Sequence, residues 1–148
     1  MSRRSVIKKR YPKPDSNYNS CLVSLLTARI LKSGKKSLAD SIILETFALV
    51  QEKTDSDPLQ VFEKAIQNIT PLVEVKARRI GGSTYQVPLE VSRYRGTNLA
   101  LRWLIAAAKA RAGRTISIKL ASEIIDASNK VGNAMRKREE THRMAEAN

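Results

Sequence analysis

The sequence predicts a mainly α protein, a single helical bundle domain of about six helices with a protruding two-stranded β-hairpin arm. Apolar residues recur at helical spacing over most of the chain after residue 18, and glycine, serine and proline interrupt the pattern at short intervals. Residues 73–88 instead alternate at the period of a strand around a Gly-Gly pair. A chain of 148 residues with 42% hydrophobic content fits one domain with its own core. We expect a basic N-terminal extension at 1–18 and a helical domain at 19–148.

The first two helices are predicted between residues 19 and 54. A helical stripe begins near Asn19 and ends near Gly34, and we expect Cys21 to lie in or near the core with it. The stripe consists of Leu22, Val23, Leu25, Leu26 and Ile30. Ser37 is expected to cap the second helix. That helix carries Leu38, Ile42 and Leu49 on one stripe, with Ile43, Phe47 and Val50 beside it.

Start signals are clearest for the third helix. Asp57 supplies a cap, Pro58 suits the first helical position, and Gln60 completes a capping box. Pro71 is expected to end this helix.

Three further helices are predicted after the hairpin. The fourth begins around Thr97 or Asn98 with Trp103 in the core, the fifth begins at Thr115 or Ser117, and the sixth runs from residue 133. The sixth contains only two large aliphatic side chains, both methionines, so it must pack on something besides the core.

Charge is the strongest functional signal in the composition. Lys and Arg number 27 against 14 Asp and Glu, a net charge of +13. Such a balance favours a polyanionic partner. No apolar run approaches the length of about 20 residues that spans a bilayer, so we expect no membrane partner. Acidic residues concentrate in 37–70, whereas the stretch between Glu90 and Glu123 is purely basic, so we expect the arm, the fourth helix and the Gly113 turn to face the polyanion.

Catalytic and metal chemistry is not expected. Cys21 and His142 are the only residues of their types, too few for a metal site or a nucleophile with its base. The GKKS segment at 34–37 lacks the earlier glycine of a phosphate-binding loop, because Arg29 stands there. The Gly-Gly-Ser segment at 81–83 precedes no helix and predicts a hairpin tip. We therefore expect no enzyme, no cofactor and no small-molecule substrate.

Several segments resemble one known family. ILKSGKKSLA, TPLVEVKARRIGGSTYQVP, LALRW and RKREETHRMAEAN are similar to segments of the small-subunit ribosomal protein seven family, in register from about Arg3 to Asn148. The MSRR start and KREETHRMAEAN most resemble its cyanobacterial and plastid branch. Family members usually continue for a few residues past the MAEAN motif.

The resemblance implies a structural protein that binds the 3′ major domain of small-subunit rRNA, nucleates assembly of the subunit head and lies near the exit-site tRNA and the mRNA path. It also implies neighbouring small-subunit proteins as partners, and the chloroplast stroma or otherwise the bacterial cytoplasm as the location. The expected rRNA-binding residues are Arg3, Arg4, Lys8, Lys9, Arg10, Lys35, Lys36, Lys76, Arg78, Arg79, Arg95, Arg102, Lys109, Arg111 and Arg114. The expected tRNA- and mRNA-proximal residues are Arg78, Arg79, Gly81, Gly82 and Tyr85. Tyr85 could stack on a base or pack against the neighbouring strand.

Two other classes remain open on the residues alone. One is an architectural double-stranded DNA-binding protein that uses a β-ribbon arm, although such arms usually carry an apolar wedge at the tip. The other is an RNA-modifying enzyme, for which no convincing cofactor loop or acid–base pair is present.

Overall fold

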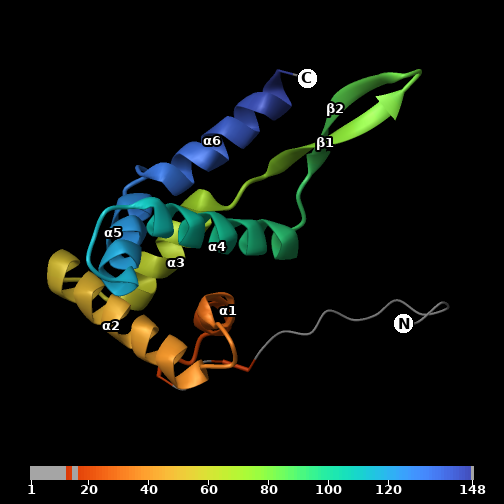
Figure 1. The fold of residues 1–148 in the computed structure, drawn as a ribbon. Coiled ribbons are helices and arrows are strands. Elements are labelled where there is room, and N and C mark those ends of the chain that lie inside the picture. Colours follow the sequence, from red (N-terminus) through yellow and green to blue (C-terminus); the bar gives the residue numbers. More distant parts are fainter. Residues whose placement is uncertain (1–12, 15–16, 148) are drawn as a thin grey trace.

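The computed structural model of the protein describes residues 13–14 and 17–147. These residues form six helices and one two-stranded antiparallel sheet, which is inserted between the third and fourth helices. Figure 1 shows the helices gathered into a body from which the two strands project, with the last helix extending alongside them. The predicted fold class is confirmed.

The first two helices differ at their ends from the prediction. Helix α1 (Cys21–Ile30) is capped by Ser20, whose side chain accepts from the Val23 amide, and it ends four residues before Gly34. Helix α2 (Lys36–Thr54) follows Lys35, which makes no side-chain cap. The expected cap at Ser37 is wrong, because Ser33 and Gly34 both adopt positive φ and turn the chain early enough to place residue 37 inside the helix.

Only one of the two apolar stripes on α2 forms the core. Ile43, Phe47 and Val50 are buried, whereas Leu38 is 55% exposed. The Phe47 ring meets the Phe62 ring of the next helix at a centroid distance of 5.4 Å. Cys21 is exposed, so its expected place in or near the core is wrong; it occupies the first position of α1, outside the stripe that packs inward.

Helices α3 (Pro58–Ile69) and α5 (Ile116–Ser128) lie in the middle of the body and pack against each other. Both helices begin where predicted: Asp57 accepts from the Leu59 amide, and Thr115, one of the two expected starts, accepts from the Ile118 amide. Asp57 caps Leu59 rather than Gln60, so the bond that the expected capping box requires is not the one formed. Helix α5 also packs against α2, so it joins the two sides of the core.

Helix α4 (Arg93–Ala110) begins earlier than predicted, because the true cap is Ser92, whose hydroxyl accepts from the Arg95 amide at 3.3 Å. Gly96 is buried in its first turn, and a Cβ there would lie 2.9 Å from Cγ2 of Thr70. A side chain is therefore excluded where α4 passes the end of α3. Trp103 packs against the core from a half-buried position.

The arm is a β-ribbon made of β1 (Val73–Ile80) and β2 (Ser83–Glu90), with Val73 opposite Glu90 and Ile80 opposite Ser83. Gly81 and Gly82 form the two-residue turn with φ of 56° and 83°, the positive values that a tight hairpin turn of matching twist requires. The hairpin is confirmed, and it extends two residues beyond its predicted end at 88.

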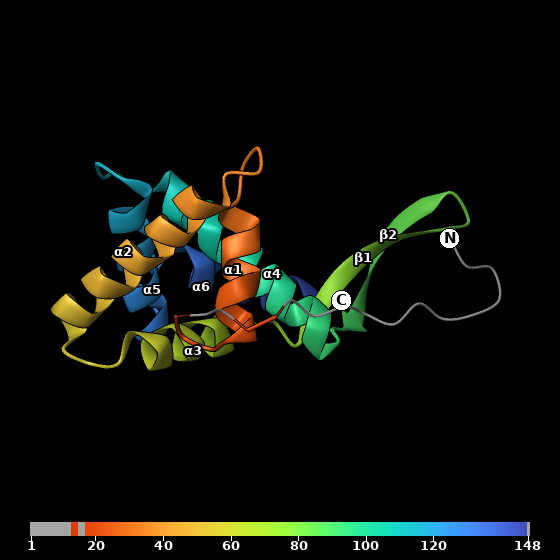
Figure 2. The ribbon, with the colours of Figure 1, turned by 90° about the horizontal axis from the view of Figure 1, so that it is seen from below.

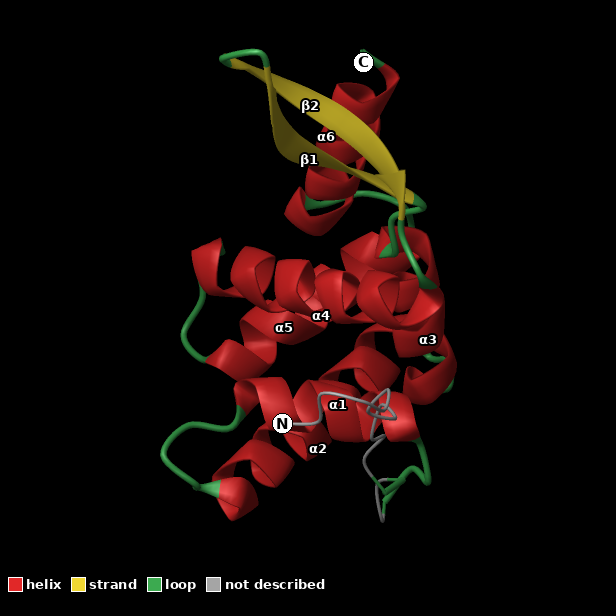
Figure 3. Ribbon diagram, turned by 90° about the vertical axis from the view of Figure 1, so that its right-hand side faces the viewer, coloured by secondary structure: helices red, strands yellow, loops and turns green. Residues whose placement is uncertain are grey.

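Helix α6 (Asn133–Glu146) leaves the body and runs beside the ribbon, as Figures 1 and 3 show from two directions. It packs against β1 and against α4. Within the described ranges, no helix combines the length and the apolar character needed to cross a bilayer.

Candidate nucleic-acid interface

A basic groove lies between α1 and α4. It is lined by Arg29 from α1 and by Arg102 and Lys109 from α4, with alanines and Ile105 forming its floor. The Arg29 guanidinium also donates to Oδ1 of Asn98 on α4 at 3.0 Å, so this side chain bridges the two helices. The two helices thus hold three cations over an apolar floor, an arrangement suited to a phosphate backbone.

An apolar cavity of about 550 Å³ lies next to the groove, beside the turn between α1 and α2. Lys109 lines both. Lys32 and Lys35 stand at the cavity, whose apolar lining is Ile30, Leu38, Ala39, Ile42, Ile105, Ile116 and Leu120. Leu38, which lies outside the core, forms part of the wall of this cavity.

The ribbon carries the second group of cations. Lys76, Arg78 and Arg79 are all exposed. Arg78 lies opposite Tyr85 in the register, so the two side chains share one face, while Arg79 lies on the other. Tyr85 is 54% exposed, which leaves much of its ring accessible beside a cation. Figure 2 shows that the ribbon projects well clear of the helical body.

Arg95 is held by an acidic residue of the ribbon, Glu74 of β1. Its Nε and Nη2 donate to the two carboxylate oxygens of Glu74 at 2.6 and 2.9 Å. These hydrogen bonds, together with the carboxylate charge, raise the pKa of Arg95 above its ordinary value. The pair ties the first turn of α4 to β1, so this arginine has a structural partner.

Arg111 is held in a second network at the end of α4. It donates to Oε2 of Glu123 and to Oδ2 of Asp126, the latter at 2.8 Å. Burial lowers the pKa of Arg111, but the hydrogen bonds to Glu123 and Asp126 outweigh that cost and raise it overall. The Glu123 side chain is fully buried, and its Oε1 accepts from the Ala134 amide at 3.0 Å.

Gly132 makes that network possible. It precedes α6 with φ of 99°, and a Cβ there would lie 2.9 Å from Oε1 of Glu123. One carboxylate therefore joins the end of α4 to the start of α6, and only glycine fits beside it.

The remaining predicted residues fall into two sets. Lys36 is exposed at the first position of α2, and Arg114 is exposed in the connection between α4 and α5. The predictions for Arg3, Arg4, Lys8, Lys9 and Arg10 lie outside the described residues.

Sequence reasoning missed Arg29 and Lys32. Arg29 lies in the last turn of α1 and lines the groove. Lys32 lies just after that helix and lines the cavity. The sequence shows only that Arg29 lies outside the apolar stripe of α1. That it lines a groove follows from the packing of α4 against α1, which the sequence pattern does not give.

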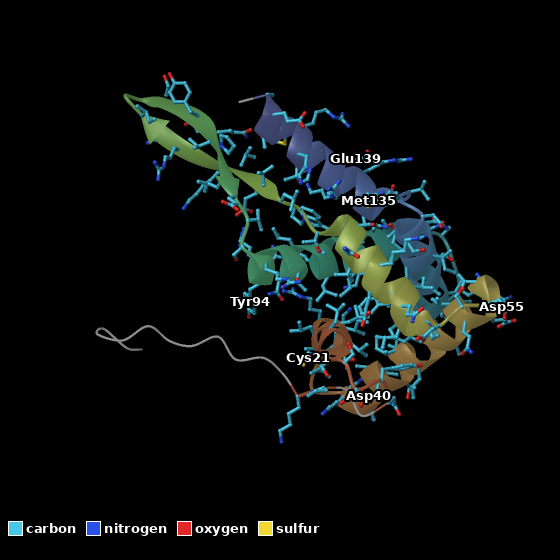
Figure 4. All side chains as sticks on the ribbon, turned by 180° about the vertical axis from the view of Figure 1, so that it is seen from behind. Cys21, Asp40, Asp55, Tyr94, Met135 and Glu139 are labelled. Atoms are coloured by element: carbon cyan, nitrogen blue, oxygen red, sulfur yellow. The ribbon has the colours of Figure 1, made fainter. Side chains whose placement is uncertain are left out.

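One group of exposed acidic residues lies on α2, on α3 and on the connection between them. In Figure 4, the labelled Asp40 and Asp55 lie along α2, at the end of the body away from the ribbon. Glu52, Asp57 and Glu63 on α2, α3 and their connection are exposed as well. In the part of the chain that the structure describes, no three His, Cys, Asp or Glu side chains form a possible metal site.

An α-helical body with a projecting basic ribbon and a basic groove defines a class of protein built to bind a polyanion. The sequence profile of the ribosomal protein S7p/S5e family matches residues 2–148, and the chain belongs to this family. The resemblance drawn from the sequence segments is thereby confirmed.

Close relatives agree with the family. The chain is 64% identical over 148 residues to small ribosomal subunit protein uS7 of Synechocystis sp., covering 100% of this chain and 95% of the relative. It is 63% identical over 144 residues to small ribosomal subunit protein uS7c of Trieres chinensis, covering 97% and 91%. The match to uS7 of Arthrospira platensis is 61% over 148 residues, covering 100% and 95%. The chain is a structural, non-enzymatic protein of the small ribosomal subunit.

Proposed function

We propose that the chain binds small-subunit rRNA directly in its 3′ major, or head, domain and nucleates assembly of the head. The observation that carries the proposal is the basic groove between α1 and α4, which adjoins a cavity with lysines at its edge. Lys/Arg contacts with phosphates and release of counterions supply the affinity. The exposed acidic residues Glu52, Asp57 and Glu63, from the end of α2 into α3, keep that part of the surface away from RNA.

Specificity comes from the shape of the folded RNA. The major groove of A-form RNA is too narrow for side chains to read, so exposed loops and unstacked nucleotides provide the discrimination. The aliphatic cavity can receive one unstacked base while Lys32, Lys35 and Lys109 contact the adjoining phosphates.

The ribbon serves a second part of the same function. Arg78, Arg79 and Tyr85, with the Gly81–Gly82 turn, reach toward the exit-site tRNA and the mRNA path beside a neighbouring small-subunit protein. The basic extension at 1–18 contacts rRNA, and residues 19–148 form the rRNA-binding domain. The place of action is the plastid ribosome in the chloroplast stroma, or otherwise the ribosome of the bacterial cytoplasm.

Salt dependence of binding to an rRNA head-domain fragment tests the proposal. Arg78→Ala and Arg79→Ala should each weaken binding and reduce the slope of log affinity against log salt by about 1 unit, since each contact releases about one counterion. Lys53→Ala, which removes a cation from the exposed acidic side of α2, is the matched control and should leave the slope unchanged. Unchanged slopes in both ribbon variants would show that these arginines do not touch phosphate.

Competition separates this function from DNA binding. Unlabelled duplex DNA at equal ionic strength should fail to displace the rRNA fragment. Efficient displacement would favour an architectural DNA-binding protein instead.

A further inference from the structure

Helix α6 is supported at both of its ends, but by different parts of the molecule. Ala134 and Met135 near its start are buried with the body's core. Ala145 near its end is also buried, at 7% exposure, although most of the helix between them is polar. Figures 1 and 3 show that the ribbon is the element running alongside this far end, and α6 packs against both strands. The helix therefore stands between the body and the arm.

Two side chains of α6 bind the backbone where the arm begins. Nε2 of His142 accepts from the Leu72 amide at 3.0 Å. Nε of Arg138 donates to the Thr70 carbonyl at 3.4 Å. Residues 70–72 connect α3 to β1, so these bonds fix the segment from which the ribbon departs.

The His142 bond requires a neutral imidazole, because a ring nitrogen accepts only when it carries no proton. Partial burial lowers the pKa of His142, and the charge of Arg138 lowers it further, while Glu146 acts in the opposite direction. The two α6 side chains thus act together: Arg138 binds the segment itself and helps keep His142 an acceptor.

Contacts from α4 hold the same segment from another side. Arg95 binds Glu74 of β1 with two hydrogen bonds. Gly96, which has no side chain, lets α4 pass close to Thr70 and Pro71. Among the described residues, α6 is the only helix that packs extensively against the strands themselves, so without it the ribbon would be held mainly at its base. Contacts from α6 as well limit its freedom to tilt.

We propose that α6 sets the direction in which the ribbon projects, with His142 and Arg138 as positioning residues at the ribbon's base. This role of α6 belongs to the protein by itself and is distinct from RNA binding. Its consequence for RNA, an arm delivered in one orientation, rests on the proposed function.

A distance measurement without RNA tests the proposal. Cys21 is the only cysteine and is exposed on α1, so it takes one spin label, and Ser83→Cys at the ribbon tip takes the second. His142→Leu should broaden the label-to-label distance distribution and shift its mean. Eight residues of strand span roughly 26 Å, so each 5° of tilt at the base moves the tip by about 2 Å. His142→Gln, whose amide oxygen can accept from the Leu72 amide, should restore the narrow distribution.

Two controls separate direction from folding. Arg143→Leu changes the adjacent exposed residue and should leave the distance unchanged. If His142→Leu reduces the helix content, the same distance is measured in Arg138→Leu. A smaller broadening is expected there, because the Arg138–Thr70 bond of 3.4 Å is longer than the His142–Leu72 bond of 3.0 Å. A well-folded His142→Leu protein with an unchanged distribution, or a His142→Gln protein as broad as His142→Leu, would overturn the proposal. If neither the parent protein nor any variant binds the rRNA fragment, the proposed function is overturned, whereas the proposal that α6 sets the direction of the ribbon still stands.

Discussion

Every helix of the body buries at least one side chain, whereas neither strand of the ribbon contains a buried residue. The body is held by apolar burial that all six helices share, and the ribbon by its own pairing, a Gly-Gly turn, the contacts at its base and packing against α6. The two regions therefore differ in what stabilises them and in what they must provide to a partner. The body must be stable before it meets a partner, but the arm needs only a defined shape and direction, which leaves its cations exposed.

The same contrast divides the arginines. Arg95 and Arg111 bind carboxylates of their own chain, and the three ion pairs found among the described residues all involve these two. Arg78, Arg79 and Arg102 make none of those pairs. Position in a basic stretch of sequence therefore does not distinguish an arginine that organises the fold from one that is available to phosphate.

The largest expected effect is on the core of the body. Phe62→Ala removes a fully buried ring and should lower the free energy of unfolding by about 3–5 kcal/mol. Tyr85→Ala, at a ribbon side chain that is 54% exposed, should change it by less than about 0.5 kcal/mol. Urea denaturation of the isolated protein measures both. Similar losses in the two variants would mean that the ribbon is part of the stable core.

Next in size is the difference between the two kinds of arginine. Arg111→Ala leaves the buried Glu123 carboxylate without its cation and should cost about 1–3 kcal/mol of stability. Arg102→Ala should leave stability within about 0.5 kcal/mol, but it should lower the salt slope of rRNA binding by about 1 unit. Denaturation and salt titration on both proteins check this. Interchanged results would reverse the roles assigned to these residues.

A smaller effect should distinguish two exposed leucines of α2. Leu38 lines the cavity beside the lysines and Leu44 does not, although the two are 55% and 43% exposed. Leu38→Glu should weaken rRNA binding about tenfold, or about 1.4 kcal/mol, because it places an anion where a base and its phosphates are proposed to lie. Leu44→Glu adds the same charge on the same helix and should have little effect. Equal affinities for the two variants would exclude the cavity from the interface.

The smallest effect concerns pH. Because the folded pKa of His142 lies below its ordinary value of 6.5, the unfolded chain takes up the proton first as pH falls. The contribution of His142 to stability is therefore complete above pH 6.5 and is lost between that value and its lower folded pKa. His142→Gln should remove this component from a plot of unfolding free energy against pH, and an unchanged plot would show that the group does not titrate as described.

Much of the fold could be predicted from local signals. Asp57 with Pro58, Thr115, and the Gly81–Gly82 pair each act through their own backbone neighbours, so their elements began or turned where expected. The errors came from tertiary context. Ser92 rather than Thr97 caps α4. The residues from Arg93 to Gly96 form a further helical turn, and Gly96 lets that turn lie close to Thr70. Leu38 follows the helical period of α2 yet faces a cavity instead of the core.

The candidate interface was predictable in outline and not in detail. Charge asymmetry along the chain placed the cations on the fourth helix and the arm, but Arg29 becomes a groove residue only when α1 lies against α4. The pairing of Arg111 with Glu123 spans a turn whose path a linear pattern does not specify.

The ribbon also differs from its supports in when it can form during synthesis. All of its pairs lie within residues 73–90, nested around one turn, so the register depends on no residue outside that span. A hairpin of this kind pairs in about 1–10 μs, far faster than a ribosome adds residues. His142 and Arg138 are added some fifty residues after the ribbon, so the pairing of the arm can form before the contacts that set its direction.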